Sequence, residues 1–248
     1  MKTIINKINL YYEKYGNKEK NIIILPGWGE TRKTFKDLIN QLKEHYTIYI
    51  IDYPGFGNTN FPNKDLTIYD YANIIKIFIE KNNIKEPNII AHSFGARITI
   101  ILEALLKVKI NKIIIINGAG IKSKKTIKQS IYKALKKLTN ILPKKLKEKA
   151  QEKLLKIFSS EDYKALPQNM KKTFSNIVKE DLTYLLKDIN TETLLIWGEK
   201  DTSTPLKDGI KMNKLIKNSG LIIIKNETHF LYINMSHYIT KIILEFIK

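Results

Sequence analysis

The sequence predicts an α/β protein built around a mostly parallel, doubly wound β-sheet. Three observations predict this fold class. Short β-branched apolar runs followed by turn residues recur along the chain, and stretches with helical spacing of apolar residues separate them. After the run that ends at Ile116, a long lysine-rich helical stretch interrupts the alternation before two more apolar runs follow. Alternating strands and helices favour right-handed βαβ units, whose strands lie parallel in one sheet.

Six apolar runs are the expected strands of this sheet. Continuous hydrophobic runs of this length are typical of strands that are covered on both faces. They are Ile22–Leu25, Ile48–Ile51, Asn88–Ala91, Ile113–Ile116, Thr193–Trp197 and Leu221–Ile224. The first 15 residues, which end at Tyr15-Gly16, are predicted to form a hairpin on the edge of the sheet.

Three apolar stripes at helical spacing are the expected helices of the core. They consist of Phe35, Leu38, Ile39 and Leu42, then Ile68, Ala72, Ile75 and Ile79, and finally the stretch from Ile233 to Ile247. A capping box of Thr67 and Asp70 marks the start of the second helix.

The stretch between Ile116 and Thr193 is predicted to be a helical insertion. Apolar residues at helical spacing run from Thr126 to Phe158, with a break at Pro143, and a further helix is expected around Thr173–Leu186. These helices either pack on the body of the protein or form a cap over a site. Because ligands bind outside the carboxyl ends of the strands in such sheets, the interpretation as a cap is attractive. We therefore expect a core of residues 1–120 and 188–248 and a cap of residues 121–187.

The most informative segment is Asn88–Ala96, in which an apolar strand runs into Ser93 and a helix follows. Ala91 and Gly95 are small, as a sharp strand-to-helix turn around Ser93 requires. Such a turn exposes the serine hydroxyl and places the backbone N–H of Phe94 at a helix N-terminus, where it can stabilise an oxyanion. The pattern predicts a nucleophile elbow with alanine in place of the first glycine.

A nucleophilic serine needs a base and an acid that orients the base. Of the four histidines, His229 follows the last strand on a loop at the carboxyl edge, and it is the predicted base. Asp201 follows the penultimate strand and is the predicted acid, with Glu199 on the same loop as the alternative. Serine, acid and histidine then occur in the order described for this elbow.

Glycines flank Trp28 in the segment Leu25–Gly29, directly after the first buried strand. The backbone N–H of Trp28 is predicted to complete an oxyanion hole with that of Phe94, and each such donor is worth about 2.7–4 kcal/mol. An ordinary strand–helix turn is the alternative interpretation, since proline and glycine favour both.

Together these motifs resemble the α/β-hydrolase superfamily over nearly the whole chain. The matching segments are Pro26–Gly29, Asp52–Gly57, the elbow at Ser93, Gly198–Asp201 with Pro205, and the loop of His229. The resemblance implies an eight-stranded sheet with a cap after the sixth strand. It also implies that Ser93 is the nucleophile, His229 the general base and then acid, and Asp201 its partner. Pro26 departs from the family, whose members typically have histidine there.

Composition excludes several other chemistries. The chain has no cysteine, and hence no thiolate nucleophile, disulfide or cysteine–zinc cluster. Its 43 basic and 24 acidic residues give a net charge of +19, but only two of the basic residues are arginine, which disfavours nucleic-acid binding. With no signal segment and no long apolar run, we expect a cytoplasmic protein without stable membrane insertion.

The predicted activity is hydrolysis of a carboxylic ester or thioester through an acyl-enzyme, without a metal or organic cofactor. The Gly-Trp-Gly and Pro-Gly-Phe-Gly segments and the basic insertion resemble the pimeloyl-carrier-protein methyl esterases. This resemblance implies an acidic acyl carrier protein as a partner of the cap, beside a small-molecule ester substrate. A C–C bond hydrolase, a menaquinone-pathway lyase and a non-catalytic binding module with the same fold remain alternatives.

Overall fold

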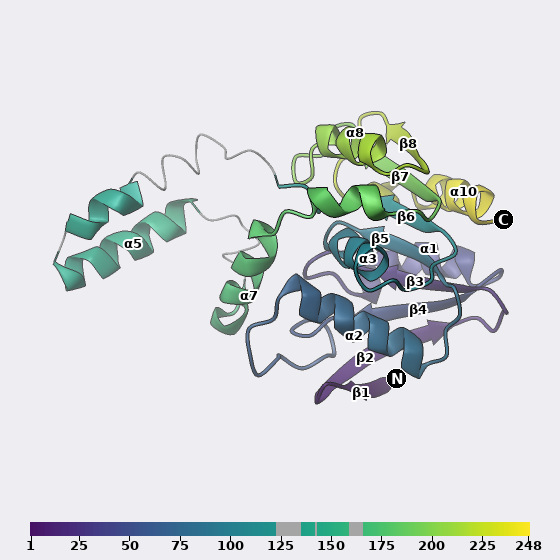
Figure 1. Ribbon diagram of the computed structural model, residues 1–248, viewed down its shortest axis with the longest axis horizontal. Coiled ribbons are helices and arrows are strands. Elements are labelled where there is room, and N and C mark those ends of the chain that lie inside the picture. Colours follow the sequence, from purple (N-terminus) through teal and green to yellow (C-terminus); the bar gives the residue numbers. More distant parts are fainter. Residues whose placement is uncertain (123–134, 142, 159–165) are drawn as a thin grey trace.

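The computed structural model describes residues 1–122, 135–141, 143–158 and 166–248, and it contains an eight-stranded sheet (Figure 1). The order of the strands across the sheet is β1-β2-β4-β3-β5-β6-β7-β8. The strands are β1 (Lys2–Ile5), β2 (Ile8–Tyr15), β3 (Asn21–Leu25), β4 (Thr47–Asp52), β5 (Asn88–His92), β6 (Ile113–Ile116), β7 (Thr193–Gly198) and β8 (Ser219–Ile224). The six strands expected from apolar runs are confirmed, with ends that differ by at most two residues.

The expected N-terminal hairpin is also confirmed. Strand β1 pairs antiparallel with β2, and β2 pairs antiparallel with β4, whereas all other neighbours in the sheet are parallel. Asn6 and Lys7 connect β1 and β2 with positive φ values of 49° and 65°. A two-residue turn with φ above zero at both positions matches the twist of the strands, and asparagine tolerates this conformation well.

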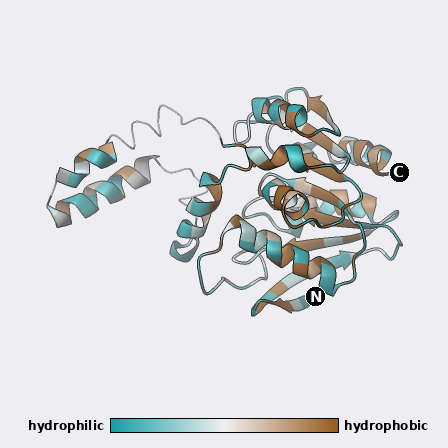
Figure 2. Ribbon diagram, viewed as in Figure 1, coloured by the Kyte–Doolittle hydropathy of each residue, from teal (hydrophilic) through white to brown (hydrophobic). Residues whose placement is uncertain are grey.

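Helices cover both faces of the sheet, as a doubly wound fold requires. The helical elements are η1 (Arg32–Phe35), α1 (Lys36–Leu42), α2 (Ile68–Lys81), α3 (Phe94–Ala104), η2 (Thr139–Ile141), α5 (Lys144–Phe158), α7 (Gln168–Lys179), η3 (Thr183–Asp188), α8 (Leu206–Leu215), α9 (Leu231–Asn234) and α10 (Ser236–Ile247). One apolar core contains residues of α2, α3, η3 and α8, and a second contains residues of α1, α9 and α10. Figure 2 shows the strands between these layers as predominantly hydrophobic.

The helix boundaries differ from the expected ones in two places. The capping box at Thr67 is present at the start of α2, as predicted. The expected C-terminal helix is divided, because Met235 between α9 and α10 has a non-helical φ of −124°. The helix expected at Thr173–Leu186 begins earlier, at Gln168, and ends at Lys179, after which η3 forms separately. Of the stripe expected from Thr126 to Phe158, residues 126–134 and 142 lie outside the described residues.

The helical insertion leaves the sheet after β6 and returns before β7. Its two ends meet, since the N–H of Leu182 donates to the carbonyl of Gly120 at 2.9 Å. The buried guanidinium of Arg97 on α3 donates to the carbonyl of Glu180 at 2.8 Å and so fixes the returning segment to the core. Figure 1 shows α5 apart from the sheet and α7 beside it. Within the described ranges, we find no helix with the length and apolarity needed to cross a bilayer.

The close approach of α3 to β3 gives a prediction about stability. A Cβ added at Gly95 would lie 2.0 Å from the carbonyl oxygen of Leu25, which is backbone and cannot move aside easily. We expect Gly95→Ala to lower the free energy of unfolding by about 1–3 kcal/mol, measured by urea denaturation. Gly220→Ala is the matched control, because no atom lies within 4 Å of its Cβ position. Equal midpoints for the two variants would contradict the prediction.

Candidate active site

Ser93 lies on a strained turn between β5 and α3. Its φ of 45° and ψ of −107° are rare for a residue with a side chain. The turn is held by neighbouring backbone: the Ser93 N–H donates to Ile116, and the Ser93 carbonyl accepts from Ala96 and Ala119. The side chain is partly exposed, whereas the neighbouring His92 is fully buried. This is the local geometry that the small residues around Ser93 predict.

His229 and Asp201 are joined directly, as the sequence predicts. Nδ1 of His229 lies 2.7 Å from Oδ2 of Asp201, and the Asp201 side chain is buried. The His229 ring lies 4.7 Å, centroid to centroid, from the ring of His92, which precedes Ser93 in the chain. The structure therefore brings the loops of all three predicted residues to one edge of the sheet. Among the described residues, the Ser93 hydroxyl has no hydrogen-bond partner.

The Asp201 carboxylate is fixed by four hydrogen bonds. Besides His229, its Oδ2 accepts from the hydroxyl of Thr204 at 2.7 Å, and its Oδ1 accepts from the N–H groups of Ser203 and Thr204 at 2.8 and 3.0 Å. Burial by itself raises the pKa of the Asp201 carboxyl, but the bonds and charge from His229 and the bonds from Thr204 outweigh burial and lower it. Asp201 is thus held ionised, with its orientation set before any substrate arrives.

Glu199, the alternative acid, does not contact His229. Its side chain is exposed and accepts a hydrogen bond from the N–H of Asn226 at 3.0 Å. Two other histidines, His45 and His237, are exposed on the surface. The geometry therefore distinguishes Asp201 from its neighbour on the same loop.

The loop Pro26–Gly29, called the glycine loop below, lies beside the elbow. The rings of Trp28 and Phe94 meet edge to face at 5.2 Å. Within the part of the chain that the structure describes, the backbone N–H groups of these two residues donate to no other group. Neither N–H group therefore has an acceptor among the described residues, a condition that an oxyanion site requires.

An aromatic wall surrounds Trp28. Its ring contacts Phe56 at 4.8 Å and Phe174 at 5.2 Å, and the ring of Phe94 packs against Tyr53 and Tyr71, each at 5.3 Å. Phe56 follows β4, and Phe174 lies on α7. Neither Phe56 nor Phe174 is predicted as a site residue from the sequence.

Helix α7 packs on the loop that follows β4. The hydroxyl of Thr173 accepts from the N–H of Leu66 at 3.0 Å, and Met170 occupies the space beside Gly55, where a Cβ would lie 2.6 Å from its side chain. With the contact between Phe174 and Trp28, these interactions hold the last helix of the insertion against the candidate site.

Asn117 is a site residue that sequence reasoning missed. It follows β6 with a φ of 46°, and its fully buried amide donates to the carbonyls of Thr228 and His229 at 3.0 and 2.8 Å. Its Oδ1 accepts from the N–H of Gly198 at 2.9 Å. Asn117 thereby ties the end of β7 to the loop that carries His229. Its position directly after a predicted strand was the available signal.

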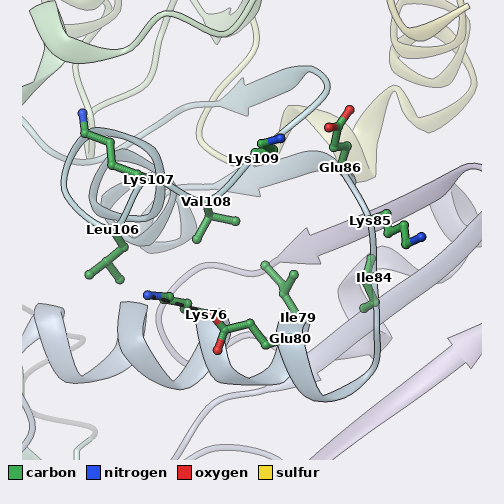
Figure 3. Close-up of a pocket in the computed structure, with 10 residues that line it drawn as sticks. All are labelled: Lys76, Ile79, Glu80, Ile84, Lys85, Glu86, Leu106, Lys107, Val108 and Lys109. Carbon is green, nitrogen blue, oxygen red and sulfur yellow. Dashed lines mark ion pairs between the residues drawn. The ribbon is translucent and has the colours of Figure 1, made fainter.

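A groove of about 530 Å³ lies at the opposite edge of the sheet (Figure 3). Its floor contains Ile84 and Val108, and its rim carries exposed Lys85, Lys107 and Lys109. These residues precede β5 and β6, so the groove is near the amino ends of the strands. It contains none of the residues predicted to do chemistry.

The chain belongs to the alpha/beta hydrolase fold family, whose sequence profile matches residues 20–235. Among its curated relatives, "Uncharacterized hydrolase YugF" of Bacillus subtilis is 26% identical, over 98% of this chain and 96% of that protein. The "Pimeloyl-[acyl-carrier protein] methyl ester esterase" of Wigglesworthia glossinidia brevipalpis is also 26% identical, over 96% and 97%. Among solved structures, the meta-cleavage product hydrolase of Pseudomonas fluorescens IP01 superposes with a TM-score of 0.76 at 17% identity, covering 99% of this chain and 96% of that one, and so shares the fold.

Proposed function

We propose that this protein is a serine hydrolase that cleaves a carboxylic ester or thioester of a small or acyl-chain substrate. The observation that carries the proposal is the 2.7 Å contact between Nδ1 of His229 and the buried, ionised Asp201, beside the strained elbow of Ser93. A nucleophile, a base and an orienting acid on three adjacent loops are the parts of a catalytic triad. The esterase names of several relatives support the same reaction class.

In the proposed mechanism, Nε2 of His229 removes the hydroxyl proton of Ser93 as Oγ attacks the ester carbonyl. Asp201 fixes the His229 tautomer with the proton on Nδ1 and stabilises the imidazolium that forms. His229 then protonates the leaving alcohol, which leaves an acyl group on Ser93. Water, activated by His229, attacks this acyl-enzyme and releases the acid.

The proposed oxyanion hole consists of the backbone N–H groups of Trp28 and Phe94. Both N–H groups lack another acceptor among the described residues, and that of Phe94 begins helix α3. Peptide dipoles at a helix N-terminus favour negative charge, so this donor suits the oxygen that becomes charged during attack.

The proposed acyl site is the aromatic wall around Trp28, which offers an apolar surface beside Ser93. Residues 121–187 act in this proposal as a cap, because Phe174 of α7 forms part of that wall. Such a site selects for apolar acyl groups and keeps water from the oxyanion.

We further propose an acidic acyl carrier protein as a partner of helix α5. Lys145, Lys149 and Lys153 are exposed and four residues apart, so they lie along one face of this helix. Complementary charge speeds encounter and sets orientation. The relative named for a carrier-protein ester supports this choice of partner.

The triple variant Lys145→Glu, Lys149→Glu, Lys153→Glu tests the carrier surface. We expect kcat/KM for a carrier-borne methyl ester to fall about tenfold or more, because each substitution reverses a charge that steers the encounter, while a free p-nitrophenyl ester is hydrolysed as before. The matched control is Lys85→Glu, Lys107→Glu, Lys109→Glu, which makes the same charge change at the remote groove. Equal losses in both triple variants, or on both substrates, would contradict the proposal.

Rapid-mixing kinetics with p-nitrophenyl esters of increasing acyl length test the proposed reaction class. We expect a burst of p-nitrophenol equal to one per protein, followed by slower turnover as the acyl-enzyme is hydrolysed. A folded protein that releases no p-nitrophenol from any ester would contradict it and favour a binding module.

A further inference from the structure

His92 and Glu30 form a close polar pair that the proposed triad does not use. Nδ1 of His92 lies 2.9 and 3.0 Å from the two carboxylate oxygens of Glu30, and the His92 side chain is fully buried. Its Nε2 lies 2.9 Å from the carbonyl oxygen of His229. His92 thereby contacts the Glu30 carboxylate through one ring nitrogen and the His229 carbonyl through the other.

The Glu30 carboxylate is ionised in this pair. Burial by itself raises the pKa of Glu30, but the charge and hydrogen bond of His92 and the N–H of Gly27 outweigh burial and lower it. That N–H donates to Oε2 of Glu30 at 2.7 Å. A Cβ at residue 27 would lie 2.8 Å from the carboxylate carbon, so only glycine admits this approach.

The pair joins three segments of the candidate site. Glu30 binds the glycine loop at Gly27, His92 precedes Ser93 on the elbow, and the carbonyl of His229 belongs to the loop of the proposed base. Along the chain, His92 is 62 residues from Glu30 and 137 residues from His229. Pro26 in the glycine loop has no side-chain donor to hold this loop.

We infer that His92 and Glu30 are positioning residues, which hold the glycine loop and the His229 loop in register with Ser93. The inference rests on the proposed function. A buried pair that only supports the fold affects stability alone. The pair of His92 and Glu30 also sets the distances between the nucleophile, the base and the oxyanion donors. A displacement of about 1 Å in such a site costs about 100-fold in rate.

The test compares Glu30→Gln, His92→Gln and the double variant with the wild type on a p-nitrophenyl ester. We expect each single variant to lower kcat about 10- to 100-fold and to change KM less than threefold, because the aromatic wall is untouched. A neutral glutamine pair can rebuild hydrogen bonds from Gly27 to the His229 carbonyl. The double variant is therefore expected to lose no more activity than the worse single variant.

Glu103→Gln is the matched control for stability. Glu103 is also a buried carboxylate, and its Oε1 accepts from the backbone N–H groups of Asn190 and Thr191 at 2.9 and 2.8 Å, before β7 at the far edge of the sheet. We expect this variant to lose stability without a change in kcat. Urea denaturation of all variants separates the two effects.

Three results would be decisive. A kcat loss in the Glu30 and His92 variants that exceeds that of Glu103→Gln at equal stability supports the inference. If the wild type is active and the variants have kcat within threefold of its value, the inference is overturned but the proposed function stands. A wild type that hydrolyses no ester overturns the proposed function, and the positioning role falls with it.

Discussion

Ser93→Ala is expected to lower kcat for p-nitrophenyl ester hydrolysis by about 10⁴-fold or more. Without Oγ no acyl-enzyme forms, and the oxyanion donors and the aromatic wall alone provide little acceleration. KM is expected to change little, since the serine hydroxyl contributes little to binding of an apolar acyl group. Removal of one oxygen from a partly exposed side chain leaves the strained turn to the backbone hydrogen bonds that already hold it.

Ser236→Ala provides the control for this prediction, because Ser236 begins α10, outside the loops that carry Ser93, Asp201 and His229. It is expected to retain wild-type kcat. Steady-state rates with purified, folded proteins decide the outcome. Residual activity above one per cent in Ser93→Ala would show that another group performs the attack.

Asp201→Asn is expected to lower kcat by about 10³- to 10⁴-fold. The asparagine oxygen can accept the N–H groups of Ser203 and Thr204, which leaves its NH₂ group facing Nδ1 of His229. The ring then accepts at Nδ1 and carries its proton on Nε2. In that tautomer His229 cannot remove the proton of Ser93.

Glu199, on the same loop as Asp201, provides the control for Asp201→Asn. Glu199→Gln changes an exposed side chain on the same loop, and its amide oxygen can still accept from Asn226. We expect kcat within twofold of the wild type, measured on the same ester. A larger loss in Glu199→Gln than in Asp201→Asn would reverse the assignment of the acid.

The sequence predicts the centre of the sheet well because the strands β3 to β7 are buried on both faces. Runs such as Ile113–Ile116 are apolar and buried at every position, so the strand appears in the sequence as an unbroken apolar run. Helix ends were less predictable. Met235 has no sequence signal for a break, yet its backbone leaves the helical region between α9 and α10.

The positions of Ser93, Asp201 and His229 were predictable because each follows a strand at the carboxyl edge. The pairing of Asp201 with His229 needed the structure to separate it from Glu199. Contacts between distant segments gave no sequence signal. The sequence shows only that His92 adjoins Ser93, whereas the structure shows its contact with Glu30.

The most direct test of the proposed mechanism is labelling with a fluorophosphonate probe, followed by intact mass measurement of the wild type and Ser93→Ala. The probe reacts with a serine that a neighbouring base activates. We predict one covalent adduct per wild-type chain and none on the variant. An unlabelled wild type that is shown to be folded, or an adduct that persists in Ser93→Ala, would contradict the role proposed for Ser93.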